Sequence, residues 1–203
     1  DNYNITLEGE LIINAISNNN ISIDFGESVT YEAKEYQLTA IITVGANKTI
    51  INCDSNNDIY LNIVKFTDVN GKIYENNLIY MYAGTYEVQV VAKGDSFETF
   101  TNNVVINQKV IETVKGYKTN KQYDGTKTVL GDITTNYLCS ADIEFVKIIG
   151  EYSNVFGDSS ITFSLVALDD NDISNRIATS YKIDLGERTG SITKRNVNFK
   201  YIS

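Results

Sequence analysis

Short runs in which apolar and polar residues alternate constrain the fold of this chain more than any other feature of its sequence. In residues 86–92, 161–167 and 181–185 every second side chain is apolar. Residues two apart along a strand face the same side of a sheet, so each run predicts a strand with one buried face. Asn70 and Gly71 tolerate positive φ and separate two further apolar-rich segments, which predicts a hairpin. The pattern as a whole favours an all-β fold.

The composition excludes several classes of catalytic site. The chain has no histidine, so it lacks the imidazole needed for a Ser-His or Cys-His dyad and for a histidine metal site. It also has no phosphate-binding glycine loop, no Gly-x-Ser-x-Gly elbow and no Cys-x-x-Cys pair. Acids are numerous enough for the carboxylate pair of a glycosidase, but units of about 90 residues rarely enclose the pocket that such a pair needs. We therefore predict that the chain is not an enzyme.

Charge is distributed unevenly along the chain. Residues 1–108 contain 14 acidic and 5 basic residues, a net charge of −9, whereas residues 109–203 contain 12 of each. This change indicates a boundary between structural units near Gln108 and Lys109. An acidic surface repels nucleic acids and anionic membranes, so neither is an expected partner. No run reaches the roughly 18 apolar residues of a membrane span, and no signal peptide is recognisable, so we expect no membrane insertion within this stretch.

A pattern near the start of the chain recurs near its end. Residues 3–12 contain YNITL and then GELI, and residues 181–193 contain YKIDL and then GSIT. The interval of about 180 positions would hold two units of about 90 residues each. Residues 1–16 are then either the last strands of an upstream repeat or the first strands of the first unit. The first unit comprises residues 17–108, and residues 109–203 contain the second unit with the start of a further repeat at 196–203.

Two segments of the second unit resemble a known family of repeats. Residues 121–129 (KQYDGTKTV) resemble the signature of the YDG repeats of large bacterial surface proteins. Residues 190–195 (GSITKR) resemble the strand that closes such a repeat. The chain departs from the family pattern at Ser180, where these repeats often place an asparagine before the tyrosine.

The first unit is similar to a related group of bacterial Ig-like repeats in residues 29–40, 83–88 and 94–97. Gly84 and Tyr86 resemble the tyrosine corner of immunoglobulin-like domains, in which a tyrosine hydroxyl binds the backbone of a nearby loop. Together the resemblances imply two tandem Ig-like β-sandwich modules in an elongated arrangement. They also imply an extracellular location at the cell surface or cell wall, neighbouring repeats of the same chain as partners, and no catalytic activity.

Tyr123, Asp124, Gly125 and Thr126 are expected to form a structural turn rather than a ligand site. Gly125 permits a left-handed backbone, the carboxylate of Asp124 can cap the turn, and Tyr123 can fill the core. None of these roles requires a bound molecule.

Asp169, Asp170 and Asp172, with Asn175, are the candidate calcium ligands, because calcium prefers clustered carboxylate and amide oxygens. They lack the spacing and the bidentate glutamate of a calcium-binding loop. A solvated acidic turn is therefore the favoured interpretation, and no cofactor is expected. Residues 53–58 are interpreted in the same way.

The cysteines and lysines of the chain raise the question of two covalent cross-links, a disulfide and an isopeptide bond. Cys53 and Cys139 fall in different units, and we expect both to be small buried hydrophobic residues rather than a disulfide. An isopeptide bond between a lysine and an asparagine is conceivable but not expected, because burying an unpaired lysine is costly. The conceivable pairs join Lys34 to Asn103 or Asn107, and Lys121 or Lys127 to Asn196.

These observations predict a non-catalytic stalk or spacer repeat of a bacterial surface protein, which stiffens or presents an adhesive region. The alternative is an adhesin module that binds a host glycan or protein through exposed tyrosine side chains, since the chain contains 14 tyrosines. A weaker third possibility is contact between copies through an exposed edge strand.

Overall fold

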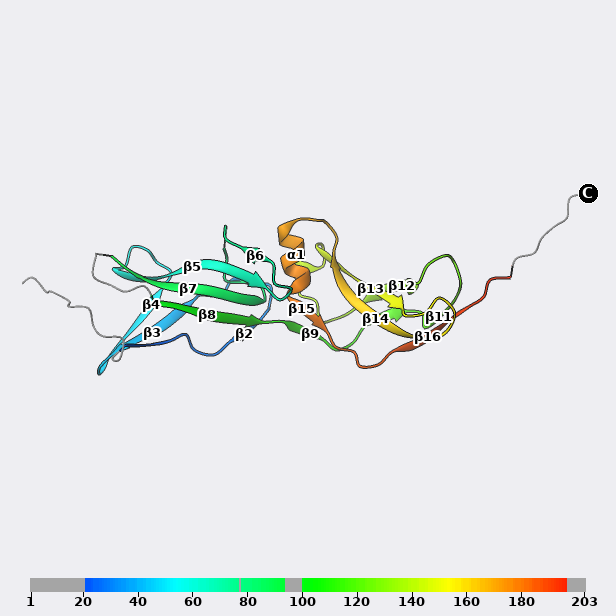
Figure 1. The fold of residues 1–203 in the computed structure, drawn as a ribbon, viewed down its shortest axis with the longest axis horizontal. Coiled ribbons are helices and arrows are strands. Elements are labelled where there is room, and N and C mark those ends of the chain that lie inside the picture. Colours follow the sequence, from blue (N-terminus) through cyan, green and yellow to red (C-terminus); the bar gives the residue numbers. More distant parts are fainter. Residues whose placement is uncertain (1–20, 77, 94–99, 197–203) are drawn as a thin grey trace, which may run out of the picture.

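Strands follow one another along a single long axis in the computed structural model of the chain, which describes residues 21–76, 78–93 and 100–196 (Figure 1). The N-terminal half, residues 21–107, lies at one end of this axis, and the C-terminal half, residues 109–196, lies at the other. Both interpretations of residues 1–16 fall outside the described residues, as do the whole segment 94–97 and residues 197–203 of the further repeat. No helix within the described ranges has the length and apolarity to cross a lipid bilayer.

The N-terminal half is built from two sheets. The first has the order β1-β3-β4 and the second the order β2-β8-β7-β5-β6. The three strands of the first sheet are β1 (Ile21–Asp24), β3 (Thr39–Val44) and β4 (Asn47–Asn52). The five strands of the second are β2 (Val29–Thr30), β5 (Ile59–Asp68), β6 (Ile73–Tyr74), β7 (Gly84–Ala92) and β8 (Phe100–Asn107).

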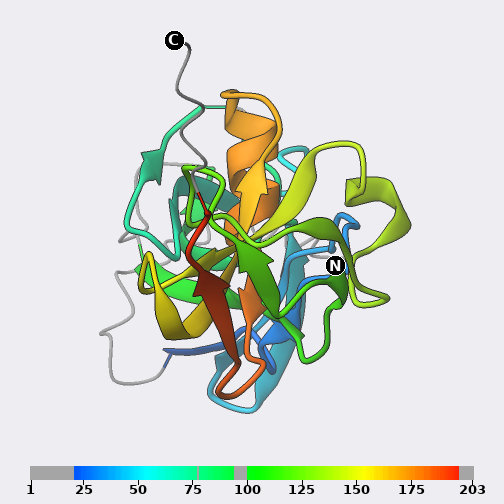
Figure 2. The ribbon, with the colours of Figure 1, turned by 90° about the vertical axis from the view of Figure 1, so that its right-hand side faces the viewer.

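The C-terminal half contains three sheets, a short 3-10 helix and one α-helix. The sheets have the orders β11-β16-β14-β13, β10-β12 and β15-β9. Figure 2 looks along the long axis towards this half, with β16 in front. The strands are β9 (Lys109–Ile111), β10 (Lys115–Tyr117), β11 (Asn120–Gln122), β12 (Gly131–Thr134), β13 (Val146–Tyr152), β14 (Gly157–Ala167), β15 (Tyr181–Ile183) and β16 (Thr189–Thr193). The helices are the 3-10 turn Ser140–Asp142 and α1 (Asp172–Thr179).

The strands predicted from alternation are confirmed. Residues 86–92 lie in β7, where Tyr86, Val88 and Val90 are buried. Residues 161–167 lie in β14, and the third run forms β15, which ends two residues earlier than predicted. The hairpin is also present, because β5 and β6 pair antiparallel around Gly71, whose φ is +87°.

The prediction of an all-β chain is wrong for one element, the helix α1. The sequence before it reads as an acidic turn, but Asn171 ends that turn as the helix N-cap, and its side chain accepts a hydrogen bond from Ser174 N at 2.8 Å. This cap satisfies a backbone amide that would otherwise lack a partner at the start of the helix. The described part of the chain is thus mostly β, with several sheets and one short α-helix.

Hydrophobic side chains from both halves form one continuous core. It includes Tyr86 and Ile106 from the N-terminal half, and Ile111, Val146 and Tyr181 from the C-terminal half. A second, smaller core lies within the C-terminal half and comprises Val129, Ile148, Tyr152, Ile161, Phe163 and Ile192. Since the larger core crosses the predicted boundary, the halves are packed on each other rather than joined by a free linker.

Each half pairs an early strand with its last strand in parallel. In the N-terminal half β2 lies beside β8, with Val29 opposite Ile106. In the C-terminal half β11 lies beside β16, with Lys121 opposite Ile192. Two parallel strands must be joined by a long connection. In each half, this connection contains most of the other strands, so the pair brings segments near the two ends of that half together.

The cysteines are placed differently from the prediction. Cys53 is exposed and Cys139 is half-buried, and both are free thiols. The thiol of Cys139 lies 3.4 Å from the ammonium nitrogen of Lys109. Cys53 follows the last residue of β4 in a polar turn, where asparagine and aspartate side chains bind nearby backbone amides.

Candidate functional site at the junction of the two halves

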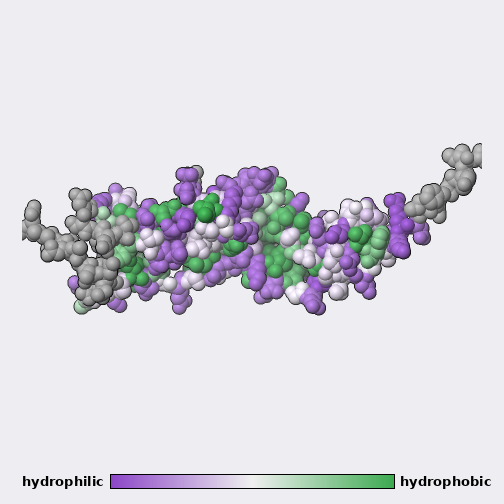
Figure 3. Space-filling view, in the orientation of Figure 1, coloured by the Kyte–Doolittle hydropathy of each residue, from purple (hydrophilic) through white to green (hydrophobic). Residues whose placement is uncertain are grey.

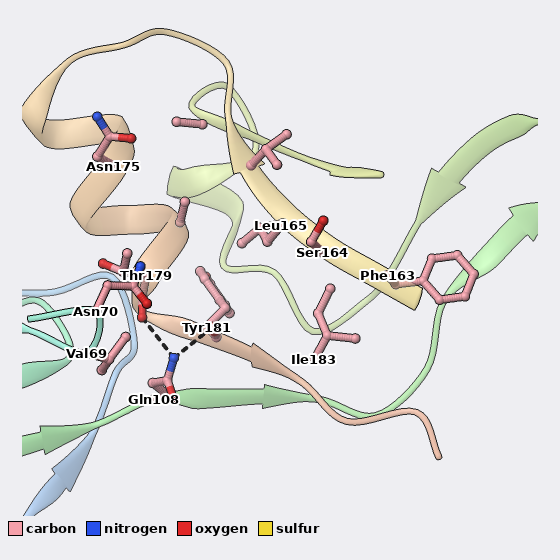
Figure 4. A pocket seen from close by; sticks show the side chains of 13 residues that line it. Val69, Asn70, Gln108, Phe163, Ser164, Leu165, Asn175, Thr179, Tyr181 and Ile183 are labelled. Carbon is pink, nitrogen blue, oxygen red and sulfur yellow. Dashed lines mark hydrogen bonds between the residues drawn. The ribbon is translucent and has the colours of Figure 1, made fainter. Parts of the chain in front are cut away.

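A single residue, Gln108, connects the two halves. β8 ends at Asn107 and β9 begins at Lys109. The side-chain amide of Gln108 donates to the carbonyl oxygens of Thr179 and Tyr181, both at 3.0 Å (Figure 4). The connection is therefore short, and its side chain is fixed to the end of α1 and the start of β15.

A buried carboxylate joins the halves a short distance away. Asp142 is 1% exposed. Its Oδ2 accepts hydrogen bonds from the hydroxyl of Tyr31 at 3.0 Å and from the hydroxyl of Tyr181 at 2.5 Å. The two rings meet edge to face at 5.3 Å, and the Tyr181 oxygen also accepts from Cys139 N at 2.9 Å. A buried charge is tolerated only when hydrogen bonds replace water, and here Tyr31 supplies one of them from the N-terminal half.

Burial and the nearby carboxylate keep both phenols protonated. Burial raises the pKa of Tyr31 far above the ordinary tyrosine value, and the charge of Asp142 raises it further. Burial also raises the pKa of Tyr181, as does its hydrogen bond to Asp142. Both hydroxyls therefore remain hydrogen-bond donors at neutral pH, and neither is a candidate nucleophile or general base.

A guanidinium forms the second part of the junction. Arg176 of α1 is 8% exposed, and its guanidinium carbon lies 4.6 Å from the centre of the Tyr74 ring and 5.2 Å from that of Tyr82. Both rings belong to the N-terminal half. Cation–π contacts of this kind are strongest where water is excluded.

Polar contacts continue from the helix to the N-terminal half. The ammonium of Lys72 lies 2.8 Å from the carboxylate of Asp172. The hydroxyl of Ser180 accepts a hydrogen bond from Ala83 N at 2.9 Å, and both residues are fully buried. The ion pair is exposed and contributes little, whereas the buried hydrogen bond satisfies a backbone amide that water cannot reach.

A groove of about 480 Å³ opens beside the junction, between α1, β14 and β15 (Figure 4). The described residues that line it carry no charged side chain; they include Val69, Gln108, Leu165 and Tyr181. Figure 3 shows hydrophobic residues gathered across the middle of this face. The only phenol in the lining, that of Tyr181, is engaged with Asp142. Among its described lining residues, the groove thus offers surface for packing and no charged side chain.

One backbone edge of β14 is unpaired along this groove. β16 pairs only with residues 157–160, and the amide of Ile161 donates on the same side to Arg188 O at 2.7 Å. Because strand amides alternate in direction, those of Phe163 and Leu165 also point to this side. Within the described part of the chain they have no hydrogen-bond partner.

At the candidate tyrosine corner, the hydroxyl of Tyr86 is bound to the backbone of the loop before β7. The hydroxyl of Tyr86, which is fully buried, donates to Tyr82 O at 2.8 Å and accepts from Tyr82 N at 2.9 Å and Met81 N at 3.2 Å. Gly84 has φ +149°, and a Cβ there would lie 2.4 Å from the carbonyl oxygen of Thr67. Only glycine therefore allows β7 to approach β5 at this point.

The residues 123–126 form a capped turn around a buried lysine. Gly125 has φ +95°, and the carboxylate of Asp124 accepts from Thr126 N at 3.0 Å. The ammonium of Lys121, whose side chain is 1% exposed, donates to Asp124 Oδ1 at 2.8 Å and to Thr126 Oγ1 at 2.9 Å. The hydrogen bonds from Lys121 and Thr126 lower the pKa of Asp124 to about 2. Tyr123 is half-buried against Phe156, with ring centres 5.1 Å apart.

The candidate calcium ligands do not converge. Asp172 pairs with Lys72, and Asp170 accepts a hydrogen bond from the side chain of Asn175 at 3.3 Å. Asp169 is exposed and precedes the helix. In the described ranges, no group of three or more acidic or cysteine side chains is arranged to hold a metal ion.

The lysines and asparagines considered for isopeptide bonds are either bound to other residues or exposed. Lys34 forms an exposed ion pair with Glu32, and the side-chain amide of Asn107 donates to Ser28 Oγ at 3.0 Å. Lys121 is bound within its own turn, as described above. Asn103, Lys127 and Asn196 are exposed.

Comparison of the chain with protein-family models, with curated proteins and with solved structures found no match. The relation to YDG and Ig-like repeats therefore remains a resemblance of the sequence.

Sequence reasoning missed the residues of the junction. Tyr31 and Asp142 are 111 positions apart, and neither lies in a recognisable motif. The one local signal for α1 was an asparagine followed by Asp172 and Ile173, the pattern of a helix N-cap before an amphipathic turn.

Proposed function

We propose that the chain is a non-catalytic spacer from a bacterial surface protein, located outside the cell, which holds an adhesive region at a set distance. Two tandem Ig-like modules would form the body of this spacer, and neighbouring repeats of the same protein would be its partners.

The observation that carries the proposal is the junction of the two halves. A one-residue connection, a shared hydrophobic core and the buried hydrogen bonds of Asp142 all oppose bending. Domains of one chain commonly move relative to each other unless their interface is hydrophobic, and here a hydrophobic core is shared. A stiff spacer is the role that such a junction serves best.

The parallel pairing of β2 with β8 and of β11 with β16 supports the same role. Tension along the long axis would act along these strands, so that several backbone hydrogen bonds would share the load. A spacer that connects a cell to a surface needs this resistance.

The alternative function, binding of a host glycan or protein through exposed tyrosines, receives less support. Of the 12 tyrosines in the described ranges, seven are buried and five are half-buried. A flat, open platform of tyrosine rings for sugar stacking is therefore not found among them.

Distance measurements between the halves test the proposal. With Cys53 and Cys139 replaced by serine, spin labels at Lys48→Cys and Lys127→Cys should give one narrow distance distribution. Adding Asp142→Ala and Arg176→Ser should broaden it, because the contacts of Asp142 with Tyr31 and of Arg176 with Tyr74 and Tyr82 are then lost. Glu87→Gln, which breaks an ion pair with Lys65 within the N-terminal half, is the control and should change nothing.

A broad distribution with the junction intact would contradict a stiff spacer. The proposed location is tested separately. Intact bacterial cells that produce the protein are treated with an added protease, and cleavage of the chain is measured. Protection of the whole chain under those conditions would place it inside the cell.

A further inference from the structure

Arg176 is a buried cation without a carboxylate partner. No acidic side chain of the described residues forms an ion pair with it. Its Nε donates to the backbone carbonyl of Asp172 at 3.3 Å, and its other contacts are the rings of Tyr74 and Tyr82. Burial of a charge without a counter-ion is costly, and aromatic rings offset only part of that cost.

The terminal nitrogens of this guanidinium remain available. They have no hydrogen-bond partner in residues 21–76, 78–93 and 100–196. Arg176 keeps 8% of its surface exposed and lines a surface pocket. The guanidinium is thus held rigidly by its surroundings while its donor groups stay accessible.

A pocket of about 460 Å³ lies in front of these donors. Arg176 and Tyr74 line it together with residues 72, 73, 75, 76 and 172, and we call the polar lining side chains of Lys72, Glu75 and Asn76 its rim. This volume suits a ligand the size of a monosaccharide. Because Lys72 is paired with Asp172, the unpaired charges at the pocket are the guanidinium and the carboxylate of Glu75.

We propose that this pocket binds an acidic sugar, with the guanidinium of Arg176 donating two parallel hydrogen bonds to its carboxylate. The planar guanidinium matches a carboxylate in geometry, and a donor already held in place loses little entropy on binding. The polar side chains of the rim are placed to bind sugar hydroxyls. The formal charges of Arg176, Lys72, Glu75 and Asp172 cancel, so a dianion gains no net attraction there and costs more to desolvate than a monoanion, which favours a carboxylate over a phosphate. This site is independent of the proposed spacer role.

Titration followed by nuclear magnetic resonance tests the site on the whole chain. Sodium glucuronate should shift the Nε–H signal of Arg176 and the amides of residues 72–76, with saturation in the millimolar range. Glucose, which lacks the carboxylate, should shift neither. Acetate, which lacks the sugar, should bind more weakly than glucuronate. Equal responses to glucose or acetate, or no saturable response to glucuronate, would overturn the proposal.

Variants separate binding from folding. Arg176→Lys keeps the charge but loses the paired donors, and we expect glucuronate affinity to fall by about tenfold or more. Lys72→Ser leaves Arg176 in place and frees Asp172 to repel glucuronate, so affinity should fall several-fold, whereas Glu75→Gln should increase it. Melting temperatures establish that each variant is folded.

Lys34→Ser is the matched control, since it removes an exposed lysine from a similar ion pair, with Glu32, in the same half. It should leave glucuronate affinity unchanged. Equal losses for Lys34→Ser and Lys72→Ser would show that affinity follows overall charge rather than this pocket. Unchanged affinity in both Lys72→Ser and Glu75→Gln would equally overturn the assignment.

Discussion

The hydroxyls of Tyr31 and Tyr181, beside the carboxylate of Asp142, contribute to the response of the junction to alkali. The pKa values of Tyr31 and Tyr181 lie above the ordinary value of 10.0, because both phenols are buried beside Asp142. In the unfolded chain both groups ionise near pH 10, whereas in the folded chain they stay protonated to higher pH. Their contribution to stability is therefore complete below about pH 10 and is lost as pH rises further.

We expect the free energy of unfolding, measured with urea, to decrease steeply above about pH 10. Tyr31→Phe should reduce that slope, since one shifted hydroxyl is removed. At neutral pH the same variant should cost on the order of 1–3 kcal/mol, because Asp142 loses one of its two buried donors. An unchanged slope above pH 10 in Tyr31→Phe would contradict this account of the junction.

Among the elements, the helix α1 links the C-terminal half to the junction, because it carries Arg176, whose guanidinium contacts Tyr74 of the N-terminal half. Asn171→Ala removes the side chain that caps the helix. We expect a loss of about 1 kcal/mol in the free energy of unfolding. The ring-proton signals of Tyr74 and Tyr82 should also move, since the guanidinium beside them is less firmly held. Asp169→Ala changes an exposed neighbour and is the control; an equal loss there would rule out capping as the cause.

Local patterns explain which elements the sequence could predict. The strands β7 and β14 could be predicted because every second residue of the runs 86–92 and 161–167 is apolar and lies on the buried face of its strand. The turn at Gly125 follows from the need for positive φ. By contrast, α1 has only eight residues, too few to show a clear helical period. Its Arg176 is covered by Tyr74 and Tyr82, which come from the other half and are remote in sequence. The carboxylate of Asp142 could not be assigned a partner for the same reason: its donors are remote in sequence.

At the scale of the whole molecule, the core shared by the halves predicts cooperative unfolding. We expect differential scanning calorimetry to show a single transition, with equal calorimetric and van't Hoff enthalpies. Asp142→Ala should lower the temperature of that transition or divide it in two, because it leaves two buried hydroxyls without their acceptor. Two separate transitions in the unaltered chain would show that the halves fold independently.

The one-residue connection at Gln108 also determines orientation about the long axis. With its backbone continuing directly from β8 into β9 and its side chain anchored twice, the second half cannot swivel against the first. In a row of such units the same rotation would be added at each step. A group displayed on one side of each unit would then recur along a helical path around the long axis. The angle between successive copies would equal the rotation between successive units.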